Sequence, residues 1–166
     1  RAFAALRNNA RLCCGVRPAA YQPFRPPRKE KTLIEYSDRK DIPQMQLEAL
    51  FLSVGWESAK YPERLVRAMR GFSTVFTAWE GDRLCALIAV LDDGEMTAYV
   101  HYLLVHPDMQ HRGIGGELIR RVTQKYDTYT KIVLHAEGNA APFYEKLGFS
   151  RMAATAMQLL PQSRRP

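Results

Sequence analysis

A glycine-rich stretch near the middle of the chain, "HPDMQHRGIGGELIRR" (106–121), constrains the fold more than any other feature. It separates an apolar, strand-like run from an amphipathic run with helical spacing, so it lies at a strand-to-helix junction. A helix N-terminus carries unpaired N–H groups and a partial positive charge, and glycine lets the backbone approach a bulky anion closely. A plain turn needs only one glycine, whereas this stretch has three, which favours a phosphate-binding loop.

Two familiar phosphate-binding loops do not fit this stretch. A dinucleotide fingerprint would need a glycine where Leu118 stands, and a P-loop would need Gly-Lys followed by Ser or Thr. What remains is the pattern Gln-x-x-Gly-x-Gly, formed by Gln110, Gly113 and Gly115. On its own, such a glycine loop is weak evidence for a particular ligand.

The hydrophobic pattern of the remaining chain predicts alternating strands and helices. Short turns between consecutive strands, such as Asp93-Gly94, require antiparallel pairing. The order βααβββαβαβ predicts one mixed domain of the α/β or α+β class. Strand character covers residues 31–36, 72–80, 83–91, 95–105, 131–136 and 151–160, and helical spacing covers residues 43–54, 62–71, 114–125 and 141–149.

The charge of the chain is unevenly distributed. Of its 24 basic residues, seven lie within residues 1–29, which contain no acidic residue, so the rest has 24 − 7 = 17 basic and 17 acidic residues. The net charge of +7 therefore belongs to the N-terminal segment and does not indicate a nucleic-acid-binding body. No apolar run approaches the ~18 residues of a membrane span, so we expect no membrane insertion.

We divide the chain into a basic tail (1–30), a folded domain (31–160) and a short C-terminal tail (161–166). The basic tail has no clear apolar period, and three origins stay open. It is similar to an Arg-rich organelle transit peptide, although residues 1–31 contain no Ser or Thr. It could also be sequence added for expression, or an arm that binds nucleic acid. We expect a cytoplasmic protein, or a plastid or mitochondrial one if the tail is a transit remnant.

Cysteine usage gives no sign of a metal site or of a disulfide framework. Cys13 and Cys14 lie in the tail and Cys85 lies in an apolar run, so the count is odd and the spacing matches no metal-binding motif. We therefore expect a reducing compartment, no metal ion and a core position for Cys85.

Three blocks, in this order, resemble the GNAT superfamily of acyl-CoA-dependent N-acetyltransferases. "VHPDMQHRGIGGELI" is similar to the family's pyrophosphate loop and following helix, "KIVLHA" to the next strand, and "FYEKLGF" to the helix that carries the family's tyrosine. The resemblance covers roughly residues 31–160. It implies the GNAT fold, in which a mixed central sheet of about six to seven strands is flanked by about four helices.

The resemblance also implies acetyl-CoA as a cosubstrate and places its binding site. Backbone N–H groups of the loop would hold the pyrophosphate, and the edge of the preceding strand would pair with the pantetheine amides. The family's asparagine stands six or seven residues before its tyrosine in many members, whereas Asn139 stands five before Tyr144, which departs from that pattern. The positions predicted to bind the cosubstrate are Leu103, Leu104, Val105, Gln110, His111, Arg112, Gly113, Ile114, Gly115, Gly116 and Asn139.

Acetyl transfer to an amine requires two proton movements. An alkyl amine with a pKa near ~10 must lose a proton before it attacks, and the leaving thiolate must gain a proton or a hydrogen bond. The resemblance predicts that Tyr144 protonates the thiolate. The alternative is that Tyr144 is a core aromatic beside Phe143.

His101 is the candidate base for the amine proton, because a histidine pKa lies close to working pH. Strict strand alternation places Tyr99 and His101 on one face and Tyr102 on the other. The arylalkylamine N-acetyltransferases, a GNAT branch, carry a histidine at the same offset from the corresponding "VH", and their second histidine corresponds here to Tyr99. Glu95 with a water chain is the alternative base, which would leave His101 as an ordinary half-buried histidine. His135 is a further candidate to line the cleft.

The sequence says less about the acceptor amine than about the cosubstrate. "LFLSVGW" (50–56), followed by "YPERLVRAMRGF", is similar to the plant serotonin N-acetyltransferase type and to small bacterial GNAT proteins. Trp56 could stack on an aromatic amine such as serotonin, or it could fill the core between two helices. A small amine, a protein N-terminus or lysine, and a non-catalytic acyl-CoA-binding module all stay open. We expect a monomer or a homodimer without nucleic-acid or membrane partners.

Overall fold

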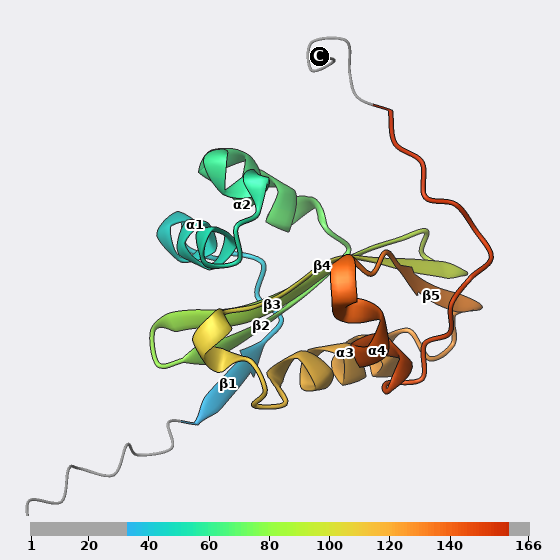
Figure 1. Ribbon diagram of the computed structural model, residues 1–166. Helices are drawn as coiled ribbons and strands as arrows, with labels where there is room; N and C mark the ends of the chain where they lie inside the picture. The colour runs from blue at the N-terminus through green and yellow to red at the C-terminus, as the bar shows by residue number, and fades with distance from the viewer. Residues whose placement is uncertain (1–32, 160–166) are drawn as a thin grey trace, which may run out of the picture. The chain divides into compact units, whose positions relative to one another are not determined.

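The computed structural model of the protein describes residues 33–159, which form a mixed α/β arrangement (Figure 1). The strands are β1 (Ile34–Ser37), β2 (Thr74–Glu80), β3 (Arg83–Asp92), β4 (Thr97–Val105) and β5 (Lys131–Leu134). The helices are α1 (Gln44–Ser53), α2 (Pro62–Gly71), α3 (Ile114–Lys125) and α4 (Ala141–Glu145), with short 3-10 turns η1 (Glu57–Lys60), η2 (Pro107–Met109) and η3 (Gly138–Ala140).

The five strands form one sheet in chain order, β1-β2-β3-β4-β5. The first four strands pair antiparallel, as their short connections require. The pair β4–β5 is parallel, and the chain reaches β5 through the crossover helix α3. The predicted α/β class and the four helices are thereby confirmed.

Proline and glycine set the helix boundaries largely as the sequence predicts. Pro43 precedes the first residue of α1, and Pro62 occupies the first position of α2, where its missing N–H would be unpaired in any case. Gly113 precedes α3 with a left-handed φ of 81°, a conformation that side chains rarely adopt.

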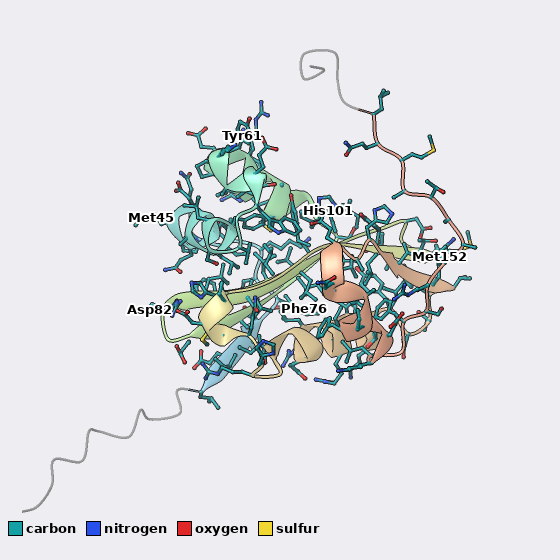
Figure 2. The ribbon with its side chains drawn as sticks, in the orientation of Figure 1. Met45, Tyr61, Phe76, Asp82, His101 and Met152 are labelled. Carbon is teal, nitrogen blue, oxygen red and sulfur yellow. The ribbon has the colours of Figure 1, made fainter. Side chains whose placement is uncertain are left out.

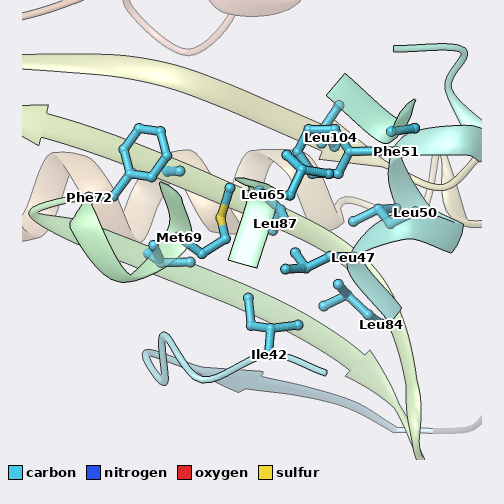
Figure 3. Packing of buried hydrophobic residues seen from close by; sticks show 13 residues of the cluster. Ile42, Leu47, Leu50, Phe51, Leu65, Met69, Phe72, Leu84, Leu87 and Leu104 are labelled. Atoms are coloured by element: carbon cyan, nitrogen blue, oxygen red, sulfur yellow. The ribbon is translucent and has the colours of Figure 1, made fainter. Parts of the chain in front are cut away.

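Helices cover both faces of the sheet. Figure 1 shows α1 and α2 on one face and α3 on the other, with α4 beside α3. A first buried cluster joins α1 and α2 to the sheet (Figure 3). Its largest fully buried side chains include Phe51, Leu47, Leu50, Met69 and Leu87.

A second buried cluster lies between the sheet and α3. Ile114, Leu118, Ile119 and Val122 form the buried face of that helix. Cys85 is completely buried in the same cluster, where burial raises the pKa of its thiol. The prediction that Cys85 is a core residue is therefore confirmed.

A bulge in β4 overturns the strict alternation expected for this strand. Ala89 of β3 pairs with Tyr102, but the next residue of β3, Val90, pairs with Val100, so His101 is the extra residue. A bulge turns the following side chains over relative to the pleat. As a result His101 and Tyr102 lie beside each other, with ring centroids 4.3 Å apart, and not on opposite faces.

The strand predicted at residues 151–160 is wrong for its described part. Residues 151–159 form no strand, and the described sheet has five strands where about six to seven were expected. This segment lacks a regular alternation of apolar and polar residues, and Met152, Met157 and Leu159 are all largely exposed. A strand needs a partner edge and a buried face, and neither is present here.

Tyr126 ties the end of α3 to the sheet through a small polar network. Its hydroxyl donates to Asp92 Oδ2 at 2.6 Å and lies 2.7 Å from Thr74 Oγ1. The hydrogen bond from Tyr126 is the main cause of a lowered pKa for the Asp92 carboxyl. Burial, followed by the bond to Asp92, raises the pKa of Tyr126.

We expect Tyr126→Phe to lower the free energy of unfolding by about 2 kcal/mol, because it removes a hydrogen bond to a charged carboxylate. Since the pKa of Asp92 is lowered in the folded state, this stabilisation is present above the usual Asp pKa of about 4 and is lost as the pH falls through the folded value. Urea unfolding at pH 7 and at pH 3 measures both effects.

The control is Tyr36→Phe, because the described structure shows no hydrogen bond from the Tyr36 hydroxyl and its ring, under Arg121, is retained. Its change should be below about 0.5 kcal/mol. Equal losses in the two variants would contradict a role for the Tyr126–Asp92 bond.

Two sets of predictions lie partly or wholly outside the described residues. The basic tail (1–30) and the C-terminal tail (161–166) are not described, so their nature and the location of the protein stay predictions. Among residues 33–159, no helix is long and apolar enough to cross a membrane.

Candidate active site

Strands β4 and β5 separate halfway along β4. Pairing is confined to four positions, from Thr97 with Lys131 to Val100 with Leu134. Beyond this point β4 continues to Val105, paired only with β3 on its other side. The second half of β4 therefore presents an open backbone edge inside the sheet, and the bulge at His101 marks where it begins.

The open edge can accept an extended ligand. Alternate residues of an antiparallel strand direct their N–H and C=O groups to opposite sides. His106 N donates to Cys85 O, so Leu104 faces β3, and Leu103 and Val105 face the open side. The side chain of Gln110 donates from Nε2 to Val105 O at 3.2 Å, which leaves the Leu103 groups and the Val105 N–H for a ligand.

Six successive backbone N–H groups beside this edge have no acceptor within residues 33–159. The N–H of Gln110 bonds to Pro107 O at 3.2 Å, and the first bond into α3 runs from Glu117 N to Gly113 O. Between them, the N–H groups of residues 111–116 are unpaired and gather at the N-terminus of α3. Such a group of donors at the positive end of a helix dipole favours a phosphate or pyrophosphate.

The two glycines of the predicted motif have different surroundings. Gly113 has the left-handed φ of 81° and open space where a Cβ would stand. Gly115 lies beside α4, where a Cβ would meet Phe143 at 3.4 Å and Val105 at 3.5 Å, which is ordinary van der Waals contact.

The other predicted loop residues shape the turn. His111 has a positive φ of 59°, and Ile114 is buried against the sheet. Arg112 bonds Glu80 Oε1 at 3.4 Å and Met109 Sδ at 3.0 Å, so its guanidinium anchors the loop to β2. Arg112 and Ile114 thus fix the loop on the sheet, while the loop's backbone N–H groups have no acceptor within residues 33–159.

Tyr144 lines a cavity of about 610 Å³ between β5, α4 and the segment after α4. Its ring packs between Phe143 and Phe149, with centroid distances of 5.0 and 5.8 Å. Burial, and secondarily the Glu137 carboxylate, raise the pKa of the Tyr144 hydroxyl. Tyr144 is therefore protonated at neutral pH and can donate a proton or a hydrogen bond.

His101 lies next to the end of α2, as Figure 2 shows, with its ring 5.5 Å from that of Phe72. Within residues 33–159 its imidazole makes no hydrogen bond or ion pair. Burial lowers its pKa below the usual histidine value. At neutral pH His101 is therefore a neutral imidazole that can accept a proton.

The structure adds a pair that the sequence predictions did not join. Tyr99 Oη lies 3.3 Å from His135 Nδ1, and both side chains line the cavity that contains Tyr144. His135 thus lines this cavity, and its place in the reaction cleft stays a prediction. The proximity of the two residues could have been predicted from the parallel register, in which Tyr99 pairs with Val133, two residues before His135.

The cavity does not include every candidate. Asn139 is exposed in η3, and neither Asn139 nor His101 lines the cavity. Glu95 is exposed, and its role as the alternative base, acting through a water chain, stays a prediction. Residues 33–159 contain no group of three His, Cys, Asp or Glu side chains that could hold a metal ion.

Comparison with known proteins identifies this arrangement. A model of the acetyltransferase (GNAT) domain matches residues 42–158. The chain belongs to the GNAT acetyltransferase family. It is therefore an N-acetyltransferase that uses an acyl-CoA cosubstrate, and the open edge of β4 with the unpaired N–H groups of residues 111–116 has donors suited to a CoA pyrophosphate and pantetheine.

Relatives and solved structures agree with GNAT membership. The chain is 30% identical, over 70% of its length and 70% of the relative's, to an uncharacterised N-acetyltransferase, ycf52, of Pyropia yezoensis. It is also 30% identical, over 68% of each chain, to ycf52 of Porphyra purpurea. A GNAT-family acetyltransferase of Streptococcus pneumoniae, 24% identical, shares the fold with a TM-score of 0.69 over 78% of this chain and 99% of that one.

Proposed function

We propose that the protein transfers an acetyl group from acetyl-CoA directly to a primary amine bound beside it. The observation that carries this proposal is the set of six unpaired N–H groups at residues 111–116, next to the open edge of β4. These donors match the charge of a pyrophosphate and the amides of pantetheine. They would place the thioester near the bulge at His101.

The two titratable side chains suit the two proton movements of the reaction. Neutral His101 accepts a proton from the acceptor ammonium, which frees the amine lone pair for attack. Protonated Tyr144 donates to the thiolate as it leaves. The pKa shifts of the two groups, lowered for His101 and raised for Tyr144, keep each in the required state at neutral pH.

We expect His101→Gln to lower kcat/KM at pH 7 by about tenfold, with partial recovery above pH 9, where more of the amine is already free. In the parent enzyme kcat/KM should rise with pH through the lowered pKa of His101. Initial rates from pH 5 to pH 10 measure both profiles.

The matched control for this experiment is Tyr36→Phe. It removes a hydroxyl from a ring on the opposite side of the sheet, beside Arg121. Its pH profile should follow the parent's. If His101→Gln also follows the parent's profile in a folded protein, His101 is not the base, and Glu95 or ordered water is left as the route for the amine proton.

We further propose an arylalkylamine, such as serotonin, as the acceptor. Aromatic rings cluster beside His101 on the α1/α2 side, where Tyr102 lies 5.7 Å from Phe72 and 5.3 Å from Trp56. Trp56 is half-buried and packs its edge against Phe51, so it contributes to the core and leaves the remainder of its surface exposed. This cluster of aromatic side chains favours an acceptor amine with a flat, apolar ring.

An acceptor screen with acetyl-CoA and detection of the released CoA thiol tests this function. We expect release with serotonin and tryptamine to exceed release with aliphatic amines or with peptides that offer an N-terminus or lysine. A preference for peptides would identify a protein acetyltransferase. Acetyl-CoA binding by calorimetry without release to any acceptor would identify a non-catalytic acyl-CoA-binding module.

A further inference from the structure

The cavity of about 610 Å³ that Tyr144 lines is larger than an acetyl group requires. It lies between β5, α4 and the segment that follows α4. Cavities of about 300–1,000 Å³ hold whole drug-sized ligands, whereas the acetyl group adds only one methyl to the thioester carbonyl. The proposed acetyl transfer therefore leaves most of this volume without a role.

Apolar side chains line much of this cavity. Strand β5 contributes Ile132 and Leu134, and α4 contributes Ala141, and all three are half-buried. Phe149 is half-buried in the wall after α4, and Met152, which also lines the cavity, is largely exposed. A lining of this kind is typical of sites for small apolar ligands. An apolar chain in the cavity would cover side chains that are partly in contact with solvent.

The charged side chains of the lining stay at solvent. Lys131 and His135 are exposed. Glu145 and Arg151 are exposed as well and form an ion pair at 2.7 Å. The residues that line the cavity thus include no buried charge, and the ion pair neutralises two of the exposed ones. Such surroundings suit an uncharged chain better than a ligand with a charge of its own.

The position of Tyr144 connects this cavity to the thioester. In the proposed reaction the Tyr144 hydroxyl donates to the sulfur atom, so the sulfur lies within hydrogen-bond distance of a residue in the cavity wall. The acyl carbon is bonded to that sulfur, and carbons beyond the carbonyl therefore begin at the cavity. Neither His101 nor the aromatic cluster of Trp56, Phe72 and Tyr102 lines it, so an acyl chain there would leave the acceptor side free.

We propose that this cavity holds the acyl chain of the cosubstrate and that the protein transfers linear acyl groups longer than acetyl, which rests on the proposed function. The free amine forms a bond to the carbonyl carbon and loses one proton. The carbon–sulfur bond breaks, and the thiolate takes a proton from Tyr144, which regains one from water. The products are a longer-chain amide and CoA. The chain adds apolar contacts and changes no step of the transfer.

A chain-length series tests the proposal, with serotonin as acceptor and acetyl-, butyryl- and hexanoyl-CoA as donors. We expect kcat/KM to rise about twofold for each added CH2. This is below the roughly fourfold of complete burial, because the cavity is open to solvent. A series that is flat, or that falls from acetyl-CoA to hexanoyl-CoA, would overturn the chain cavity and leave acetyl transfer in place.

Two methionines of the segment after α4 give matched variants. Met152 lines the cavity and Met157 does not, and both are largely exposed, so replacement of either by Ala should leave folding intact. Met152→Ala should lower kcat/KM for hexanoyl-CoA by about threefold and leave that for acetyl-CoA unchanged. Met157→Ala should reproduce the parent series. Identical series for the two variants would show that the acyl chain lies elsewhere.

Binding of S-alkyl-CoA thioethers separates the cavity from the chemistry, because a thioether has no acyl group to transfer. Calorimetric affinity should rise from S-ethyl-CoA to S-hexyl-CoA, and should rise less in Met152→Ala. Equal affinities for all chain lengths in the parent would overturn the chain cavity even if acetyl-CoA is turned over. A parent that binds the longer thioethers more tightly but releases CoA from no donor to any acceptor would instead contradict the proposed function, and the transfer of longer chains with it.

Discussion

Tyr144→Phe is expected to lower kcat by about 10²-fold, with little change in the KM for acetyl-CoA. The substitution keeps the ring between Phe143 and Phe149 and removes only the hydroxyl. The described structure shows no hydrogen bond from that hydroxyl to the rest of the protein, so the folded state should lose little stability. Loss of kcat would therefore report the missing proton donor and not a rearranged cavity.

The pH dependence of the parent gives a second signature of Tyr144. Because its pKa is raised, the hydroxyl keeps its proton at neutral pH and loses it only in the alkaline range above the usual tyrosine value. The parent should lose kcat there, and Tyr144→Phe should not. Steady-state rates with the Tyr36→Phe control decide the matter, and a fully active Tyr144→Phe enzyme would leave Tyr144 as a core aromatic.

Gly113→Asp is expected to weaken acetyl-CoA binding by about 100-fold relative to Gly113→Asn. Asn and Asp have the same size, and both tolerate the left-handed φ of 81° better than most residues, so the backbone strain is matched. The variants differ by one negative charge beside the unpaired N–H groups of residues 111–116. At a few ångströms from a pyrophosphate, that charge is worth about 3 kcal/mol.

The same pair of variants separates binding from folding. An acidic residue at a helix N-terminus stabilises the helix, so Gly113→Asp should unfold at a temperature equal to or above that of Gly113→Asn. Calorimetric titration with acetyl-CoA, together with thermal unfolding, measures the two quantities. Equal affinities in two folded variants would place the pyrophosphate elsewhere.

Local sequence patterns predicted most of the elements because their signals are short-range. Pro62, Gly55 and Gly113 mark helix ends or starts through backbone geometry alone. The apolar face of α3 follows from spacing within one helix. The strand predicted at residues 151–160 failed because strand formation depends on a partner that the segment itself does not encode.

The candidate site was only partly predictable for a related reason. The residue types of Tyr144 and His101 indicated proton transfer, but the bulge that turns His101 toward Tyr102 depends on pairing with β3. The contact between the Cβ position of Gly115 and Phe143 of another helix likewise depends on tertiary packing. The Tyr99–His135 contact joins residues 36 positions apart and required the β4–β5 register.

The agreement between strand order and chain order bears on how the protein folds. Strands β2, β3 and β4 form an antiparallel meander whose contacts are local along the chain, so little loop-closure entropy opposes their pairing. The parallel pairing of β4 with β5 can form only after the long connection through α3 has folded back onto the sheet. The opening in the sheet lies between these two strands, so we expect the cosubstrate cleft to be the last part of the domain to assemble.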